Sequence, residues 1–145
     1  MKLFIIHGPN LNMLGKREPS IYGSRTYQDL LTYIDDYAKS KGIKTCFFQS
    51  NHEGALVDFI QAAYESADGI ILNPGAYGHT SIAILDALKT VNLPAVEVHL
   101  SDIYHREAFR HVSYTSLGCI KTICGKGFAG YIEAIDTLAD HLKQR

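Results

Sequence analysis

One short apolar stretch of the sequence carries ionisable side chains in alternation with aliphatic ones. In the run 95–101, a period of two places Glu97, His99 and Ser101 on one face of a β-strand and the aliphatic residues on the other. A carboxylate in a buried strand is costly unless it has a partner. Glu97 and His99 either satisfy polar neighbours in the core, or form a carboxylate–imidazole pair for general acid–base catalysis. We favour the catalytic interpretation, because core strands rarely accept a glutamate without need.

A second group of reactive side chains lies in a long connection without periodicity, between His7 and Thr26. It carries Arg17, Tyr22 and Arg25 within about twenty residues, whereas a loop from strand to helix usually has ~2–6. A phenol with a pKa of ~10 is a poor base at neutral pH, but adjacent guanidinium groups favour the phenolate. From spacing alone, an aromatic side chain that packs against its own loop is the simpler interpretation of Tyr22.

Three arginines form a third candidate group. Arg17, Arg106 and Arg110 together can bind a carboxylate, because guanidinium groups pair with carboxylates in a bidentate way. Solvation at the surface is the alternative for each arginine taken singly.

Two glycine-rich patterns do not predict a nucleotide site. The segment 125–130 matches G-x-G-x-x-G, but the dinucleotide fingerprint needs a further strand with an acidic residue ~20 positions on, and only one helix follows. A tight turn with close helix–strand packing explains this segment better. The segment 8–17 has the wrong spacing for a phosphate-binding loop, and Arg17 stands where Ser or Thr is required.

The sequence also argues against a catalytic triad and against a metal site. His79, Ser81 and Asp86 include the residue types of a catalytic triad, but Ser81 lacks the context of a nucleophile elbow. His79, Glu97 and His99 have the ligand types of a metal site, but no H-E-x-x-H motif accompanies them. The residues therefore argue against a metal site.

The composition indicates one soluble globular domain, 1–145. Fourteen basic residues against fifteen acidic ones give a net charge of −1, which argues against a nucleic-acid partner. The apolar run near the N-terminus is too short for a signal peptide, and no segment approaches the ~18 apolar residues of a membrane span. We expect a cytoplasmic protein without a membrane partner, in which the three cysteines are thiols: Cys46, Cys119 and Cys124.

The hydrophobic pattern switches repeatedly between short apolar runs and amphipathic segments. The apolar runs are typical of parallel strands and lie at 3–6, 43–48, 69–72, 95–100 and 117–124. The amphipathic segments predict helices at 27–38, 56–67, 82–88, 105–111 and 132–142, the first with a capping box at Thr26 and Asp29, and the third capped by Thr80 or Ser81.

This alternation predicts an α/β fold, a flavodoxin-like three-layer sandwich with a five-stranded parallel sheet. Ligands of such folds bind beyond the carboxyl ends of the strands. Polar residues follow the predicted strands at that edge: Asn10 and Asn12, then 49–52, then 73–79, then Ser101. The candidate site should therefore lie there.

With these residues placed, the chain resembles the type II 3-dehydroquinate dehydratases of the shikimate pathway. The stretches that carry the resemblance span nearly the whole chain and are 6–15, 17–19 with 21–23, 49–54, 73–77 with 79–81, 97–101, and 106–107 with 109–110. Together they are highly specific, although no single stretch is. Gly78 and the segment 102–105 depart from the usual pattern of the family, and Asp102 adds a negative charge close to a site for an anion.

The resemblance implies elimination of water from 3-dehydroquinate through an enolate, without metal or cofactor. It implies that Tyr22, in a lid at about 17–25, is the base, that Arg17 stabilises the transition state, and that His99 is the acid. Asn10 would stabilise the enolate through a water, and Glu97 the charged form of His99. The substrate-binding positions fall on Asn73, His79, Asp86, Leu100, Ser101, Arg106 and Arg110.

The resemblance also implies a homo-dodecamer, a tetramer of trimers, in which Asp86 reaches the site of a neighbouring subunit. Two other interpretations come from the fold or the composition alone. A nucleotide- or flavin-binding module needs a phosphate cradle, and the sequence offers none. A non-enzymatic oligomeric scaffold leaves the Glu97–His99 face and the long Arg/Tyr loop unexplained.

Overall fold

The computed structural model describes residues 1–16, 20 and 24–144, and the site residues Arg17 and Tyr22 lie outside them. Five strands and four α-helices make up the regular part of the described chain. In order they are β1 (Lys2–His7), α2 (Tyr27–Ser40), β2 (Lys44–Gln49), α3 (Glu53–Ala63), β3 (Gly69–Asn73), α4 (Ile82–Val91), β4 (Ala95–His99), β5 (Lys121–Cys124) and α5 (Ala129–Lys143).

The five strands form one sheet in the order β2-β1-β3-β4-β5, and every pair is parallel. The predicted α/β fold with a five-stranded parallel sheet is therefore confirmed. The chain moves to one side of β1 for β2 and to the other side for β3. In a sheet of this order, the crevice between β1 and β3 is the point where ligands bind.

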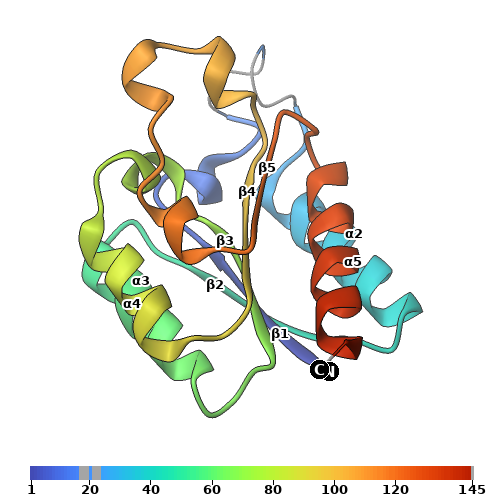
Figure 1. Cartoon of the computed structure of the whole chain (residues 1–145). Coiled ribbons are helices and arrows are strands. Elements are labelled where there is room, and N and C mark those ends of the chain that lie inside the picture. The colour runs from blue at the N-terminus through green and yellow to red at the C-terminus, as the bar shows by residue number, and fades with distance from the viewer. Residues whose placement is uncertain (17–19, 21–23, 145) are drawn as a thin grey trace.

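Each face of the sheet packs against two helices, as Figure 1 shows. Odd-numbered positions of β1, such as Leu3 and Ile5, join the core under α2 and α5. The alternate positions Phe4 and Ile6 join the core under α3 and α4. The period of two along a strand thus divides one apolar run between two cores, which makes the three layers of the sandwich.

The helix starts follow the predicted capping chemistry. Thr26 and Asp29 form a reciprocal capping box at the start of α2, and Gly42 follows its end with a positive φ of 70°. Ser81 caps α4 by accepting a hydrogen bond from the N–H of Ile84 at 3.0 Å. These side chains satisfy N–H groups that the first turn of a helix leaves unpaired.

The long connection between β4 and β5 differs from the sequence prediction. The expected helix at 105–111 is wrong: two 3₁₀ turns, Ile103–His105 and Ala108–Arg110, flank extended backbone at Arg106 and Glu107. The last strand begins at 121, not 117, because Thr115–Gly118 forms another 3₁₀ turn. Hydrogen bonds to buried groups fix this segment, and local periodicity does not report such bonds.

The edge strands also differ from the expectation of fully buried strands. The residues of β2 are half-buried or exposed, and β5 contains one buried residue, whereas β1, β3 and β4 are almost wholly buried. The reason is that each edge strand has a neighbour on one side only. Within the described residues, no helix has the length and apolar character needed to cross a membrane.

Candidate active site

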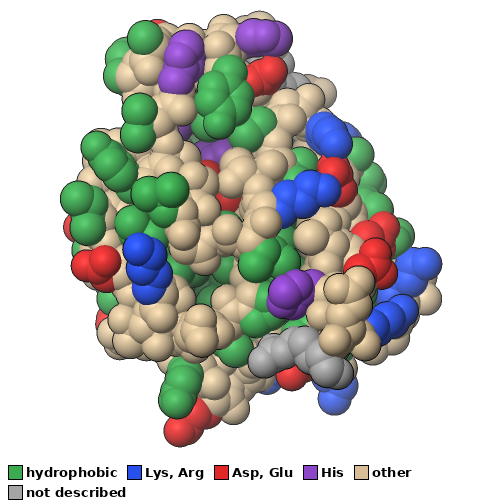
Figure 2. All heavy atoms as spheres, viewed as in Figure 1, with side chains coloured by type: hydrophobic (Ala, Val, Ile, Leu, Met, Phe, Trp, Pro, Cys, Tyr) green, Lys and Arg blue, Asp and Glu red, His purple; other side chains and the backbone are tan. Residues whose placement is uncertain are grey.

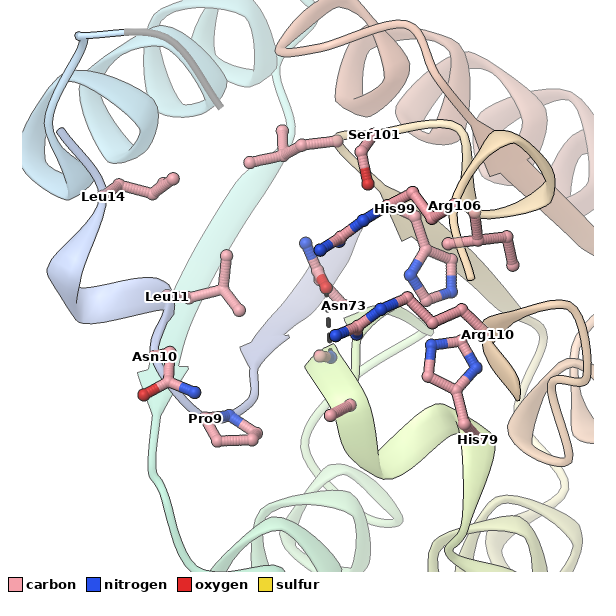
Figure 3. Close-up of a pocket in the computed structure, with 14 residues that line it drawn as sticks. Pro9, Asn10, Leu11, Leu14, Asn73, His79, His99, Ser101, Arg106 and Arg110 are labelled. Atoms are coloured by element: carbon pink, nitrogen blue, oxygen red, sulfur yellow. Dashed lines mark hydrogen bonds between the residues drawn. The ribbon is translucent and has the colours of Figure 1, made fainter. Parts of the chain in front are cut away.

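A pocket opens at the carboxyl ends of β1, β3 and β4, where the sheet order predicts a ligand site (Figure 3). Its walls come from the segments that follow these strands and from the connection between β4 and β5. Eight of the residues selected from the sequence line this one pocket: Asn10, Asn73, His79, His99, Leu100, Ser101, Arg106 and Arg110.

His99 and Glu97 form a buried pair at the wall of the pocket. The Nε2 atom of His99 lies 2.8 Å from Oε2 of Glu97, and the exposed fractions of the two residues are 6% and 0%. Both side chains leave β4 on the same face, as the alternation in the sequence predicts. A carboxylate on one ring nitrogen directs the other ring nitrogen away from the core, which suits a proton donor at a pocket.

Two hydroxyl groups complete the surroundings of the Glu97 carboxylate. Ser113 donates to Oε2 at 2.6 Å, and Thr115 donates a short hydrogen bond to Oε1. Burial alone would raise the pKa of Glu97, but hydrogen bonds from His99, Ser113 and Thr115 and the charge on His99 lower it below its usual range. The carboxylate is therefore ionised at neutral pH. Sequence reasoning missed both hydroxyl groups, because nothing local marks them as partners of β4.

His79 lies beside His99 with its ring nearly parallel. The ring centroids are 6.1 Å apart, with an interplanar angle of 19°. Nδ1 of His79 lies 2.7 Å from the backbone carbonyl of Val112. A carbonyl only accepts, so Nδ1 carries a proton, and Nε2 is left to contact the pocket or a ligand. The predicted binding residue is thus held by backbone from the β4–β5 connection.

Arg106 and Arg110 supply the positive charge of the pocket. Figure 3 shows both guanidinium groups extending toward Asn73. The Nε atom of Arg110 donates to Glu107 at 3.0 Å, and Arg106 lies 4.0 Å from the other oxygen of the same carboxylate. The hydrogen bond from Arg110 lowers the pKa of Glu107, so this carboxylate is charged. The extended backbone at 106 and 107 thus presents two cations to a ligand.

Asn10 occupies strained backbone at the mouth of the pocket. Its φ of 71° lies in the left-handed region, which asparagine tolerates better than most residues. Its backbone N–H donates to Oδ1 of Asn51, and the amide of Gln49 donates to that same oxygen and to the carbonyl of Gly8. The end of β2 therefore fixes the position of Asn10.

The start of this loop also requires close contact between backbones. A Cβ atom on Gly8 would lie 2.3 Å from the carbonyl oxygen of Pro74, which no side chain tolerates. Gly75 follows Pro74 with φ of +59°, and its N–H donates to Oδ1 of Asn73 at 3.2 Å. The two segments that begin the pocket after β1 and β3 thus touch each other.

The glycine-rich segment after β5 fixes the end of β4. The N–H of Gly125 donates to the carbonyls of His99 and Ser101, and the N–H of Gly127 donates to that of Leu100. The N–H groups of Gly125 and Gly127 are thus used within the protein. The interpretation as a tight structural turn is confirmed, and the turn holds Leu100 and Ser101 at the pocket.

Two predicted features lie away from this cluster. Asp86 is exposed on α4 and does not line the pocket. The guanidinium group of Arg25 lies 3.7 Å from the centroid of the Phe128 ring, just before the start of α5, and Arg25 does not line the pocket. Within the described residues, no three His, Cys, Asp or Glu side chains converge in a geometry suited to a metal ion.

A family model described as Dehydroquinase class II matches residues 1–139 of this chain. The chain belongs to the class II dehydroquinase family. It is 51% identical to a 3-dehydroquinate dehydratase from Clostridium acetobutylicum, over 99% of this chain and 100% of that protein. It is 55% identical to a protein of the same name from Fusobacterium nucleatum, over 97% and 98% of the two chains.

Solved structures of class II dehydroquinases agree with the observed fold. The type II dehydroquinase from Butyrivibrio crossotus superposes with a TM-score of 0.94 at 52% identity, over 96% of this chain and 97% of that one. The type II dehydroquinase from Propionibacterium acnes gives a TM-score of 0.92 at 38% identity, over 96% of each chain. These matches extend the family assignment from the sequence to the whole backbone.

Proposed function

We propose that this chain is a 3-dehydroquinate dehydratase that eliminates water from its substrate to give 3-dehydroshikimate through an enolate. Membership of the class II dehydroquinase family and the names of relatives about half identical to it support this activity. The observation that carries the proposal is the buried Glu97–His99 pair at the wall of a pocket that also receives two arginine side chains. This pocket combines a proton donor with a binding site for an anion.

In the proposed reaction, Tyr22 is the base that removes a proton from the carbon next to the ketone. Arg17 favours the phenolate form of Tyr22 and stabilises the transition state. The enolate that forms needs preorganised hydrogen-bond donors, and Asn10 supplies one through a water. The C–O bond to the β-hydroxyl then breaks, and His99 gives its proton to the departing oxygen, so that water leaves. Neither step requires a metal or an organic cofactor.

Glu97 supports the acid role of His99 from inside the core. An ionised carboxylate 2.8 Å from the ring stabilises the imidazolium form, which is the form that can donate a proton. Ser113 and Thr115 keep that carboxylate ionised by donating to both of its oxygens. The pair therefore places a proton donor at the wall of the pocket, although it is buried.

The remaining residues of the pocket bind the substrate in this proposal. Arg106 and Arg110 attract its carboxylate, because guanidinium groups form charge-assisted hydrogen bonds to such groups. Asn73, His79 and the segment Leu100–Ser101 contact its other oxygens. The loop at about 17–25 closes over the bound substrate and excludes water, which strengthens each electrostatic contact.

Assembly into a dodecamer, a tetramer of trimers, completes the site in this proposal. Asp86 is exposed and lies off the pocket, as a residue that serves a neighbouring subunit would be. Exposed hydrophobic side chains gather over the connection between β4 and β5 (Figure 2), among them Tyr104, Phe109 and Leu117. Surfaces of this kind are typical of subunit contacts. We place the enzyme in the cytoplasm, in the shikimate pathway toward chorismate and the aromatic amino acids.

The decisive experiment is an assay of the purified protein with 3-dehydroquinate after treatment with a chelator. We expect the ultraviolet absorbance of the conjugated enone to rise, because dehydration places a double bond next to the ketone. His99→Ala should give a folded protein with little turnover. Folded wild-type protein that does not turn over 3-dehydroquinate would rule out the activity, and turnover lost with the chelator would rule out the metal-independent mechanism.

A further inference from the structure

A buried imidazole that takes no part in the proposed chemistry lies directly behind the pocket. His7 ends β1 and is fully buried, and its partner in the neighbouring strand β3 is the pocket residue Asn73. Nδ1 of His7 lies 3.0 Å from the hydroxyl of Tyr27 in α2, and Nε2 lies 3.0 Å from the hydroxyl of Tyr131 in α5. The Tyr131 hydroxyl also lies 3.1 Å from Nδ2 of Asn73. A continuous series of hydrogen bonds therefore connects Tyr27 of α2 to Asn73 at the pocket.

The contact between Gly75 and Asn73, at the pocket end, fixes the direction of every hydrogen bond in this series. The N–H of Gly75 can only donate, so the Asn73 atom next to it is the oxygen Oδ1. The atom of Asn73 next to Tyr131 is then Nδ2, which can only donate. Tyr131 accepts this hydrogen bond, and among the described residues the only acceptor within reach of its own O–H is Nε2 of His7, so it donates there. His7 therefore carries its proton on Nδ1 and donates it to Tyr27.

Burial favours the same arrangement. It lowers the pKa of His7 to about 3 and raises the pKa of Tyr131 and of Tyr27, so all three groups are neutral at neutral pH. A reversed Asn73 amide would set its NH₂ group against the N–H of Gly75. It would also require the proton of His7 to move from Nδ1 to Nε2, so that Tyr131 could donate to the amide oxygen. The hydrogen bond from Gly75 would be lost, so the observed orientation is preferred.

We propose that Tyr131 and His7 are positioning residues that hold the Asn73 amide in one orientation and so present the substrate with a fixed N–H donor. Nδ2 of Asn73 has two hydrogens, and Tyr131 accepts one of them. The second has no acceptor among the described residues, and Asn73 lines the pocket with an exposed fraction of 4%. This inference rests on the proposed function for the identity of the ligand, but the orientation of the amide does not depend on it.

The first test needs no substrate. In protein labelled with ¹⁵N, the resonance that disappears in His7→Gln identifies His7, and we expect Nδ1 of that ring to carry the proton. One side-chain N–H of Asn73 should exchange slowly with water in the wild type and faster in Tyr131→Phe. A proton on Nε2 of His7, or exchange of Asn73 unchanged by Tyr131→Phe, would overturn the proposal whether or not the protein is an enzyme.

The second test uses steady-state kinetics with 3-dehydroquinate. We expect Tyr131→Phe to raise KM about 10-fold with kcat within about 2-fold, because the affected group binds the substrate without reacting. In an Asn73→Ala background the same change should have no further effect on KM, since the amide that Tyr131 positions is gone. Independent effects in the double variant, or an unchanged KM in Tyr131→Phe, would contradict a positioning role.

A matched control separates positioning from general stability. Tyr37 also joins α2 to α5, through a hydrogen bond of 2.5 Å from its hydroxyl to Asp136, and it lies away from the pocket. Tyr37→Phe should leave KM at the wild-type value even if Tm falls. His7→Gln places an amide oxygen near the former Nε2 and should keep KM closer to the wild-type value than His7→Leu does. Equal KM values for the two His7 variants would overturn the proposal.

Discussion

The chemistry of single residues in this protein depends on what surrounds them inside the fold. Glu97 has no exposed surface, and it stays ionised because three side chains donate hydrogen bonds to its two oxygens. His7 is equally buried and stays neutral because burial lowers its pKa, and the two groups hydrogen-bonded to its ring are uncharged hydroxyls. Of these two buried ionisable groups, Glu97 is thus charged and His7 is neutral. Burial and the hydrogen-bond partners set the charge of each group.

At this scale, the base assignment predicts a specific loss of turnover. Tyr22→Phe should lower kcat about 10²–10⁴-fold, the usual contribution of a general base, because the phenyl ring cannot accept a proton. Binding of 3-dehydroquinate, measured by calorimetry, should persist. Tyr64→Phe is the control, since Tyr64 is 62% exposed at the end of α3 and should keep wild-type kcat. A kcat for Tyr22→Phe near the wild-type value would exclude Tyr22 as the base.

Among the elements, the connection from β4 to β5 does the most to complete the pocket. It supplies Arg106 and Arg110 to the pocket, Ser113 and Thr115 to the Glu97 carboxylate, and a backbone carbonyl to His79. Its 3₁₀ turns carry little periodicity, which explains why the sequence pattern suggested one short helix instead. An irregular segment fixed by buried hydrogen bonds can place side chains in directions that one helical face cannot.

This role of the connection predicts a stability effect at Thr115. Thr115→Val keeps the shape of the side chain but removes a donor to a buried carboxylate, so the free energy of unfolding should fall by about 1–3 kcal/mol. Urea denaturation measures the change. Thr137→Val is the control, because the hydroxyl of Thr137 donates only to a backbone carbonyl within α5, and we expect a loss below about 1 kcal/mol. Equal losses in the two variants would show that Thr115 has no special role.

For the whole molecule, burial of His7 links folding to pH. The pKa of His7 is about 3 in the folded protein against 6.5 for an exposed histidine, so between these values the unfolded chain binds a proton that the folded protein excludes. Stability should therefore fall as pH drops from about 6.5 toward 3, by up to about 1.4 kcal/mol per pH unit from this group.

The comparison of wild type with His7→Gln isolates this contribution. Glutamine does not titrate, whereas the carboxylates titrate in both proteins. Denaturation at several pH values should give a steeper loss of stability for the wild type across that window. Parallel curves for the two proteins would mean that His7 titrates normally in the folded state.

The proposed assembly predicts complementation between subunits. Asp86→Ala and Tyr22→Phe should each be nearly inactive alone. When the two are mixed by unfolding and refolding together, a subunit with Tyr22 can meet a neighbour with Asp86. Random mixing in a ring of subunits should restore up to about a quarter of the sites. No recovery of kcat in the mixture, with each variant still assembled by light scattering, would show that Asp86 does not act across an interface.

The fold and much of the site could be predicted from the sequence, because both leave local patterns. Alternating strand and helix periods predict the parallel sheet, and the period of two in β4 places Glu97 and His99 on one face. The order of polar segments after the strands predicts that Asn10, Asn73 and Ser101 meet at one edge. Family motifs add which of these residues belong to a dehydroquinase.

The sequence by itself determined the elements, their order and the edge of the sheet that carries the site, because each of these follows from spacing along the chain. Only the tertiary structure decided which distant groups touch. Tyr131 lies 124 positions from His7 in the sequence, and Thr115 lies 18 positions from Glu97. Such pairs depend on strand register and helix packing, which no local period encodes. The charge states of Glu97 and His7 follow from those contacts, so they too belong to the tertiary structure.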